Sequence, residues 1–172
     1  GNLRDLITIW FAAVALQDRN VPVRLIHSWD DFDRFRKVPK GIPESYNEFI
    51  GRPLSKIPDP SNRYPSYAAR YEAEFESSLL EMGIKIEFLY QTPLYESGIY
   101  SEAIGEAVRA RHAIYDILSG FKTQEGSHEE KEGYFPLTIY CDGCGKDTTR
   151  VGSAKNEETS LAYTCASCKQ DG

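Results

Sequence analysis

Four cysteines carry the clearest chemistry in this sequence, and they lie close together near its carboxyl end. They form two Cys-x-x-Cys pairs, Cys141 with Cys144 and Cys165 with Cys168. Each pair can wrap two thiolates around one metal ion, and two such pairs are typical of a tetrahedral zinc site. Because four thiolates leave no coordination position for a water or a substrate, the predicted zinc ion is structural.

Two disulfides or four free thiols are the alternative for these cysteines. The sequence shows no secretion signal pattern, so we expect a reducing cytoplasm, where disulfides are rare and metal sites are common. The segment 147–164 can form a hairpin that brings the two pairs together, with Val151 and 161–163 as its strand-like parts. Residues 134–172 are therefore predicted to form a small zinc-ribbon-like module.

A second candidate site follows the apolar segment 21–29, which predicts a strand buried on both faces. Asp30, Asp31 and Asp33 come directly after it. In open parallel sheets ligands bind beyond the carboxyl ends of the strands, so these carboxylates are candidate ligand contacts. A solvated turn, in which the aspartates pair with nearby cations, is the alternative interpretation.

Those cations are Arg34, Arg36 and Lys37, with Lys40 a little further along the chain. A basic run of this kind can contact phosphate groups. It can equally form a solvated face that neutralises the preceding aspartates, and the sequence leaves both interpretations open.

The elements around these residues alternate between helix and strand. Hydrophobic spacing predicts helices over 2–18, 66–82 and 101–119, and strands over 21–29 and 84–90. This order favours an α/β fold with a parallel sheet and flanking helices over residues 1–123. Gly83 is expected to cap the second helix, and residues 124–133 are expected to form a polar linker.

Composition restricts the function classes. With 172 residues, 41% hydrophobic and 27% charged, the chain can bury a core, and no apolar run approaches the length of a membrane span. Its net charge of −6 argues against a general nucleic-acid coat protein. Any contact with RNA is expected to use a local patch or parts of the protein that are not present in this chain. We expect a monomer with no membrane or DNA partner.

The segment from Ile26 to Pro39 resembles the second-strand motif of class I lysyl-tRNA synthetases nearly letter for letter. The start, 1–5, resembles the tail of that family's HIGH-like motif, in which Gly-Asn opens the first helix. Further likeness extends over almost the whole chain, in residues 58–60, 66–68, 88–90, 114–118 and 121–125.

The resemblance implies part of a Rossmann-like catalytic domain that activates lysine with ATP and Mg²⁺ and transfers it to tRNA(Lys). It implies that Gly1 and Asn2 face the ATP phosphates, although Asn2 can also simply cap its helix. It places the lysine pocket and the tRNA contacts in the segment after the second strand. The implied pocket residues are Trp29, Asp30, Asp31 and Asp33, and the implied tRNA or phosphate contacts are Arg34, Arg36 and Lys37.

Each of these implied roles has a rival. Trp29 can fill core space instead of lining the pocket, and no more than one of the three aspartates need face lysine. Some family members carry another zinc site after the Pro-Asp-Pro segment. Here Arg63, Tyr64 and Arg70 occupy the expected ligand positions, so we expect no metal beside Asp59.

Parts of the family's active site are missing from this sequence. The first strand, the KMSK-type loop and the anticodon-binding domain have no counterpart here, so the chain alone is expected to be inactive. Two other functions remain open. One is another class I synthetase, such as a glutamyl-tRNA synthetase relative, and the other is a non-catalytic zinc ribbon that binds nucleic acid.

Overall fold

The computed structural model describes residues 3–121, 127–155 and 160–172. Its elements are, in chain order, α1 (Leu3–Gln17), β1 (Ile26–Trp29), the 3₁₀ helices η1 (Glu44–Phe49) and η2 (Leu54–Lys56), α2 (Tyr67–Glu81), β2 (Glu87–Tyr90), α3 (Gln91–Glu96), α4 (Ser101–Arg109), α5 (Arg111–Ser119), α6 (His128–Glu132), β3 (Thr149–Lys155) and β4 (Ser160–Cys165). Among these residues no helix is both long enough and apolar enough to cross a membrane.

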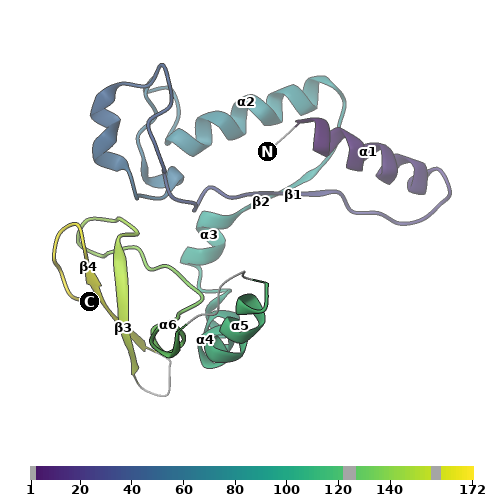
Figure 1. Cartoon of the computed structure of the whole chain (residues 1–172). Helices are drawn as coiled ribbons and strands as arrows, with labels where there is room; N and C mark the ends of the chain where they lie inside the picture. Colours follow the sequence, from purple (N-terminus) through teal and green to yellow (C-terminus); the bar gives the residue numbers. More distant parts are fainter. Residues whose placement is uncertain (1–2, 122–126, 156–159) are drawn as a thin grey trace.

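Strands β1 and β2 pair in parallel, with Ile26 opposite Glu87 and Trp29 opposite Tyr90. The predicted parallel pairing of these two segments is therefore confirmed. Helices α1 and α2 lie on the same side of the pair, and α3 leads from β2 toward the lower half of the molecule (Figure 1). A core centred on Leu6, Leu79 and Ile84 joins α1 and α2 to the start of the second strand segment.

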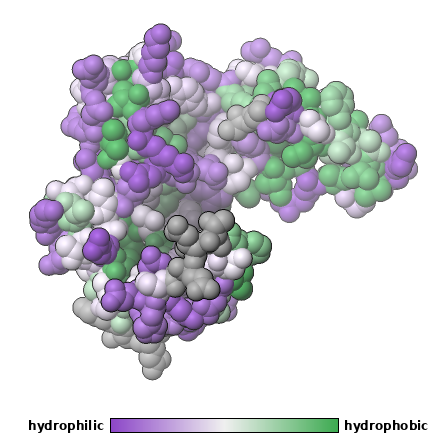
Figure 2. Space-filling view, in the orientation of Figure 1, coloured by the Kyte–Doolittle hydropathy of each residue, from purple (hydrophilic) through white to green (hydrophobic). Residues whose placement is uncertain are grey.

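The prediction of a strand over 21–29 buried on both faces is wrong. Only Ile26–Trp29 forms the strand, and the Ile26 side chain is 44% exposed. Within the described residues β1 has a single partner strand, and α1 and α2 lie on the same side of it. Apolar side chains also remain exposed along α1, as Figure 2 shows, with Phe11 62% exposed.

Helix α2 begins and ends with the expected capping chemistry. The Ser66 hydroxyl accepts a hydrogen bond from the Ala69 N–H, at 3.1 Å. At the other end Gly83 has φ of +72°, its N–H donates to Leu80 O, and the N–H of Ile84 donates to Leu79 O. This is a Schellman motif, in which the left-handed residue is usually glycine. The prediction that Gly83 caps this helix is confirmed.

Two predictions for the later helices are wrong, and one short helix was missed. The single helix predicted over 101–119 is broken at Ala110, whose ψ of 7° separates α4 from α5. The predicted linker over 124–133 contains α6, which a capping box between Ser127 and Glu130 stabilises. Helix α3 was not predicted, because its six residues are too few to show a helical period.

The proline-rich segment between β1 and α2, residues 38–65, packs around a core of its own. Phe35, Tyr46, Ile57 and Tyr67 are buried together, and the two 3₁₀ helices lie within this segment. The segment is therefore an ordered part of the fold that supports the turn after β1.

Asp59 organises the end of this segment. Its Oδ2 accepts hydrogen bonds from the Ser61 hydroxyl and from the backbone N–H groups of Arg63 and Tyr64. Burial by itself raises the pKa of the Asp59 carboxyl, but these hydrogen bonds outweigh it and lower the pKa to about 2. Asp59 therefore holds the loop as a carboxylate.

The depressed pKa of Asp59 predicts a pH-dependent contribution to stability. Because the folded-state pKa lies below the ordinary value, the stabilisation is present above about pH 4 and is lost as the pH falls through about 2. Asp59→Ala should therefore lower the urea midpoint at pH 6, and the difference from the unmodified chain should shrink toward pH 2. The exposed Asp18→Ala is the control. An equal difference at both pH values would contradict this assignment.

Candidate functional site

The turn after β1 contains the three predicted aspartates, and the structure gives each a different environment. Asp31 is buried, and its Oδ1 accepts a hydrogen bond from the Thr92 N–H, at 2.9 Å. Thr92 lies in the first turn of α3, where a carboxylate satisfies a free backbone donor and is favoured by the helix dipole. Asp31 therefore ties the end of β1 to the start of α3.

Asp30 and Asp33 are exposed. An Oδ2 of Asp33 lies 3.7 Å from a guanidinium nitrogen of Arg36, an exposed pair of low energetic weight. The N–H of Asp33 donates to Asp30 O, which closes the turn. The Asp30 carboxylate lies just after the end of β1 and forms no ion pair with another described residue.

A cavity of about 610 Å³ opens between this turn, β1 and α2. Carboxylates dominate its polar lining, with Asp30, Asp31 and Asp33 from the turn and Glu72 from α2. Its apolar walls include Trp29 and the rings of Tyr67 and Tyr71. Such a cavity suits a ligand that combines positive charge with an aliphatic or aromatic body.

Glu72 is the most perturbed of these acids. Burial raises its pKa to about 7, with the negative charges of Asp31 and Glu76 adding to the effect. Its Oε1 is buried and has no hydrogen-bond partner in the described structure. A buried carboxyl without a partner costs free energy, and a cation placed beside it would remove that cost.

Trp29 both lines this cavity and fills core space. Its indole Nε1 donates to Glu76 Oε1 at 2.9 Å, and its ring packs edge-on against His27 and Phe75. The Tyr90 hydroxyl donates to the same Glu76 oxygen, at 2.8 Å. The two donors fix the Glu76 carboxylate behind the cavity wall.

Sequence reasoning missed Glu72 and Glu76. They lie four residues apart on α2, each one position after a member of the aromatic series Tyr71 and Phe75. Acidic residues at that spacing, on the flank of a buried helical stripe, were the signal that could have identified them.

A second cavity, of about 600 Å³, lies on the other side of the turn. Asp30 and Asp33 line it as well, opposite residues 136–140, which belong to the four-cysteine module at the carboxyl end (residues 134–172). Tyr95 and Gln91 of α3 complete the wall nearest the sheet. The aspartate turn therefore separates two cavities of similar size.

The basic residues of the turn do not act as one patch. Arg34 Nε lies 3.0 Å from Oδ2 of Asp147, in the carboxyl-terminal module. Arg36 pairs with Asp33, and Lys37 is exposed beside a shallow depression formed by 37–50. None of the three lines either of the cavities beside the aspartates. The other predicted residues, Gly1 and Asn2, lie outside the described part of the chain.

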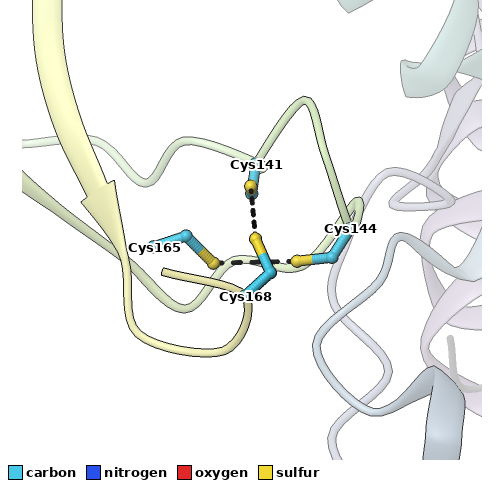
Figure 3. Close-up of side chains that lie close together, drawn as sticks. All are labelled: Cys141, Cys144, Cys165 and Cys168. Carbon is cyan, nitrogen blue, oxygen red and sulfur yellow. Dashed lines mark hydrogen bonds between the residues drawn. The ribbon is translucent and has the colours of Figure 1, made fainter. Parts of the chain in front are cut away.

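The four cysteines converge at the base of the β3–β4 hairpin (Figure 3). All four sulfur atoms lie within 4.8 Å of one another. The Sγ atoms of Cys141 and Cys168 are 3.5 Å apart, and those of Cys144 and Cys165 are 3.6 Å apart. A tetrahedral zinc ion with bonds of about 2.3 Å requires sulfurs about 3.8 Å apart, so the donor set fits zinc.

Backbone N–H groups favour the thiolate forms of Cys141 and Cys165. The N–H of Cys144 lowers the pKa of Cys141, and the N–H of Cys168, aided by the Thr148 hydroxyl, lowers the pKa of Cys165 to about 6. At Cys168 a backbone hydrogen bond from Gln170 acts in the same direction, but the contact with Cys141 and burial outweigh it and raise the pKa to about 12. The predicted hairpin is confirmed, since β3 and β4 pair antiparallel from Thr149–Cys165 to Lys155–Ser160. Apart from the cysteines, Tyr163 is the one fully buried hydrophobic side chain among the described residues of this module, and Ile139 packs against it partly buried.

The chain is similar in sequence to known tRNA synthetases along its whole length. The family model described as "tRNA synthetases class I (K)" matches residues 1–172. A lysine–tRNA ligase of Treponema pallidum is 36% identical over 96% of this chain and 31% of its own length. One of Pyrococcus horikoshii is 39% identical over 82% of this chain and 27% of its own length.

A lysine–tRNA ligase of Streptomyces coelicolor is 36% identical over 98% of this chain and 34% of its own length. The chain thus spans about a third of the length of these relatives. Because the family match covers every residue, it includes both the sheet with its aspartate turn and the four-cysteine module. The chain belongs to the class I tRNA synthetases of the lysine (K) family.

Proposed function

We propose that this chain is the lysine-binding part of a lysine–tRNA ligase, which activates lysine with ATP and transfers it to tRNA(Lys). The family match over residues 1–172 carries the proposal. The carboxylate-lined cavity beside β1 supports lysine as the amino acid. A glutamyl-tRNA synthetase relative would need cations in that position, because the same carboxylates repel a glutamate side chain.

Lysine presents two ammonium groups, and the cavity offers two carboxylates with unused hydrogen-bonding capacity. Asp30 is exposed at its mouth, and Glu72 has an unpaired oxygen at its wall. Asp31 already accepts the Thr92 N–H, and Asp33 pairs with Arg36 at the rim. We therefore assign the main ammonium contacts to Asp30 and Glu72, while Trp29 closes one side of the pocket.

The proposed reaction needs little covalent chemistry from the protein. The lysine carboxylate, ionised at neutral pH, attacks the α-phosphorus of ATP and pyrophosphate leaves, so no general base is required. Mg²⁺ bound to ATP neutralises phosphate charge. We propose that Gly1 and Asn2, which precede α1 in the sequence, face the phosphates through backbone N–H groups.

For tRNA(Lys), we propose that the acceptor end reaches the second cavity, since it adjoins the same aspartate turn. The exposed Arg36 and Lys37 are the candidate phosphate contacts. Arg34 is a weaker candidate because its guanidinium already pairs with Asp147.

We propose one structural zinc ion on Cys141, Cys144, Cys165 and Cys168. The ion would cross-link the two ends of the hairpin and stabilise residues 134–172 as a unit distinct from 1–123. A module with one buried aromatic residue cannot fold on its apolar core alone. Because thiolate ligands must stay reduced, the cytoplasm is the proposed compartment.

The intact enzyme should catalyse ATP–pyrophosphate exchange that depends on lysine. Asp30→Ala should lower kcat/KM for lysine by about one to two powers of ten, because a hydrogen bond to a charged group contributes about 1.5–3 kcal/mol. Asp18→Ala, in the exposed turn after α1, is the control and should leave the kinetics unchanged. Exchange that depends on glutamate instead would favour the rival family, and no exchange at all would favour a non-catalytic zinc ribbon.

Glu72→Gln should raise the KM for lysine while stabilising the fold at alkaline pH. The pKa of Glu72 is raised to about 7, so its unfavourable contribution is absent below about pH 4.5 and grows as the pH rises through 7. Melting temperatures at pH 5 and pH 8 measure this, and only the pH 8 value should rise clearly. A lower melting temperature at pH 8 would assign Glu72 to stability instead of binding.

Metal analysis of protein purified under reducing conditions should give one zinc ion per chain. Chelation or Cys165→Ser should speed amide hydrogen exchange beyond about Tyr134 and leave α1 and α2 protected, since comparable sites contribute on the order of 10 kcal/mol. Ser153→Ala, on the exposed surface of β3, is the matched control. Zinc-free protein with an unchanged exchange pattern would contradict the assignment.

A further inference from the structure

The four-cysteine module contacts the aspartate turn through a residue that closely follows its first cysteine pair. Asp147 reaches Arg34 with an Oδ2–Nε distance of 3.0 Å. The Asp147 side chain is only 6% exposed, and its other oxygen has no hydrogen-bond partner in the described structure. Arg34 is therefore the cation that compensates a nearly buried carboxylate.

Backbone hydrogen bonds fix Asp147 relative to the cysteines. The N–H of Cys141 donates to Lys146 O at 2.9 Å, and the N–H of Asp147 donates to Gly51 O at 2.8 Å. Gly51 has φ of +95°, and a Cβ there would lie 3.0 Å from Asp147 Oδ1. Only glycine allows this approach without strain, so the position of Asp147 is set by the cysteine pair and by the proline-rich segment.

The turn is equally fixed where Asp147 meets it. The N–H of Phe35 donates to Arg52 O, and the N–H of Gly51 donates to Phe35 O. A second contact from the module lies on the other side of Asp33, where the Tyr140 hydroxyl donates to Phe32 O at 2.7 Å.

Two contacts from the module thus hold Phe32 and Arg34, the residues on either side of Asp33. The same turn carries Asp30 into the cavity assigned to lysine. A displacement of the turn by about 1 Å is enough to impair a site that depends on geometry. The module is therefore connected to the lysine pocket by direct contacts as well as by the chain.

We propose that the Arg34–Asp147 ion pair is a positioning contact, through which the folded four-cysteine module sets the geometry of the aspartate turn and thereby the affinity for lysine. This inference rests on the proposed function, since it takes the cavity beside β1 as the lysine site. It assigns the module a role in amino-acid binding, and it assigns Arg34 a role other than phosphate contact.

The test uses Asp147→Ala in the intact enzyme, with three measurements. The KM for lysine in pyrophosphate exchange should rise about tenfold while kcat stays within about twofold. Zinc content should be unchanged, because Asp147 is not a ligand. Amide exchange of residues 31–35 should be faster, since the Phe35 N–H bond to Arg52 lies next to the lost contact.

Two further variants separate positioning from general destabilisation. Arg34→Lys keeps the charge and should hold KM within about threefold of the unmodified enzyme, whereas Arg34→Ala leaves a buried carboxylate unpaired and should have a larger effect than Asp147→Ala. Asp171→Ala is the matched control, because Asp171 lies in the same module and bonds Thr164 without touching the turn. Its KM and exchange pattern should not change.

Unchanged KM and unchanged exchange of residues 31–35 in Asp147→Ala would overturn the proposal. So would loss of zinc in that variant, because the effect would then come from unfolding of the module. If the unmodified enzyme shows no lysine-dependent exchange, the proposed function fails, and the hydrogen-exchange comparison still decides whether Asp147 holds the turn.

Discussion

The buried carboxylate of Asp31 is the contact on which the arrangement of the site depends. It lies at the end of β1 and accepts the Thr92 N–H at the start of α3, so one hydrogen bond joins the two strand ends beyond the sheet. The backbone of Asp31 also receives the Ser55 N–H from the proline-rich segment. The aspartate turn is therefore held by the sheet, by α3 and by the segment before α2. A carboxylate that performs this task is less available to a ligand, and for this reason we propose its exposed neighbour Asp30 and Glu72 across the cavity as the ligand contacts.

The two halves of the molecule are stabilised by different means. Around α1, α2 and β2 an ordinary apolar core forms, centred on Leu79 and Ile84. Among its described residues, the module around β3 and β4 buries little besides its cysteines and Tyr163, so we propose that cross-linking through a metal replaces burial there. The halves are joined by both polar and aromatic contacts. The polar contacts are the Arg34–Asp147 ion pair, the Tyr140 hydroxyl on Phe32 O and the Asp147 N–H on Gly51 O. The Phe32 ring, which stacks on Tyr95, also packs edge-on against Tyr140.

Local chemistry could be predicted from the sequence, whereas environments created by distant segments could not. The cysteine spacing and the Gly83 cap are local patterns, and both matched the structure, because a knuckle and a Schellman motif are each completed within a few residues. The strand over 21–29 was predicted too long and too buried, since burial depends on partners that these residues do not contain. The break at Ala110 carries no local signal, because alanine is the best helix former. The environments of Glu72 and Asp147 are created by residues that are distant in the sequence, such as Asp31 for Glu72 and Arg34 for Asp147. Hydrophobic periodicity does not reveal contacts at such sequence separations.

The elevated pKa of Glu72 has a consequence for how the cavity handles cations. Near neutral pH a fraction of the Glu72 carboxyl groups is protonated, and this proton reduces the negative charge of the empty cavity. An ammonium group that binds beside Glu72 favours the carboxylate form and lowers the pKa of Glu72. Binding of the cation therefore releases the proton to the solvent. Occupation of the cavity is then an exchange of one positive charge for another. The measured enthalpy of cation binding therefore includes the enthalpy of protonation of the buffer by the released proton. The apparent affinity for the cation rises with pH.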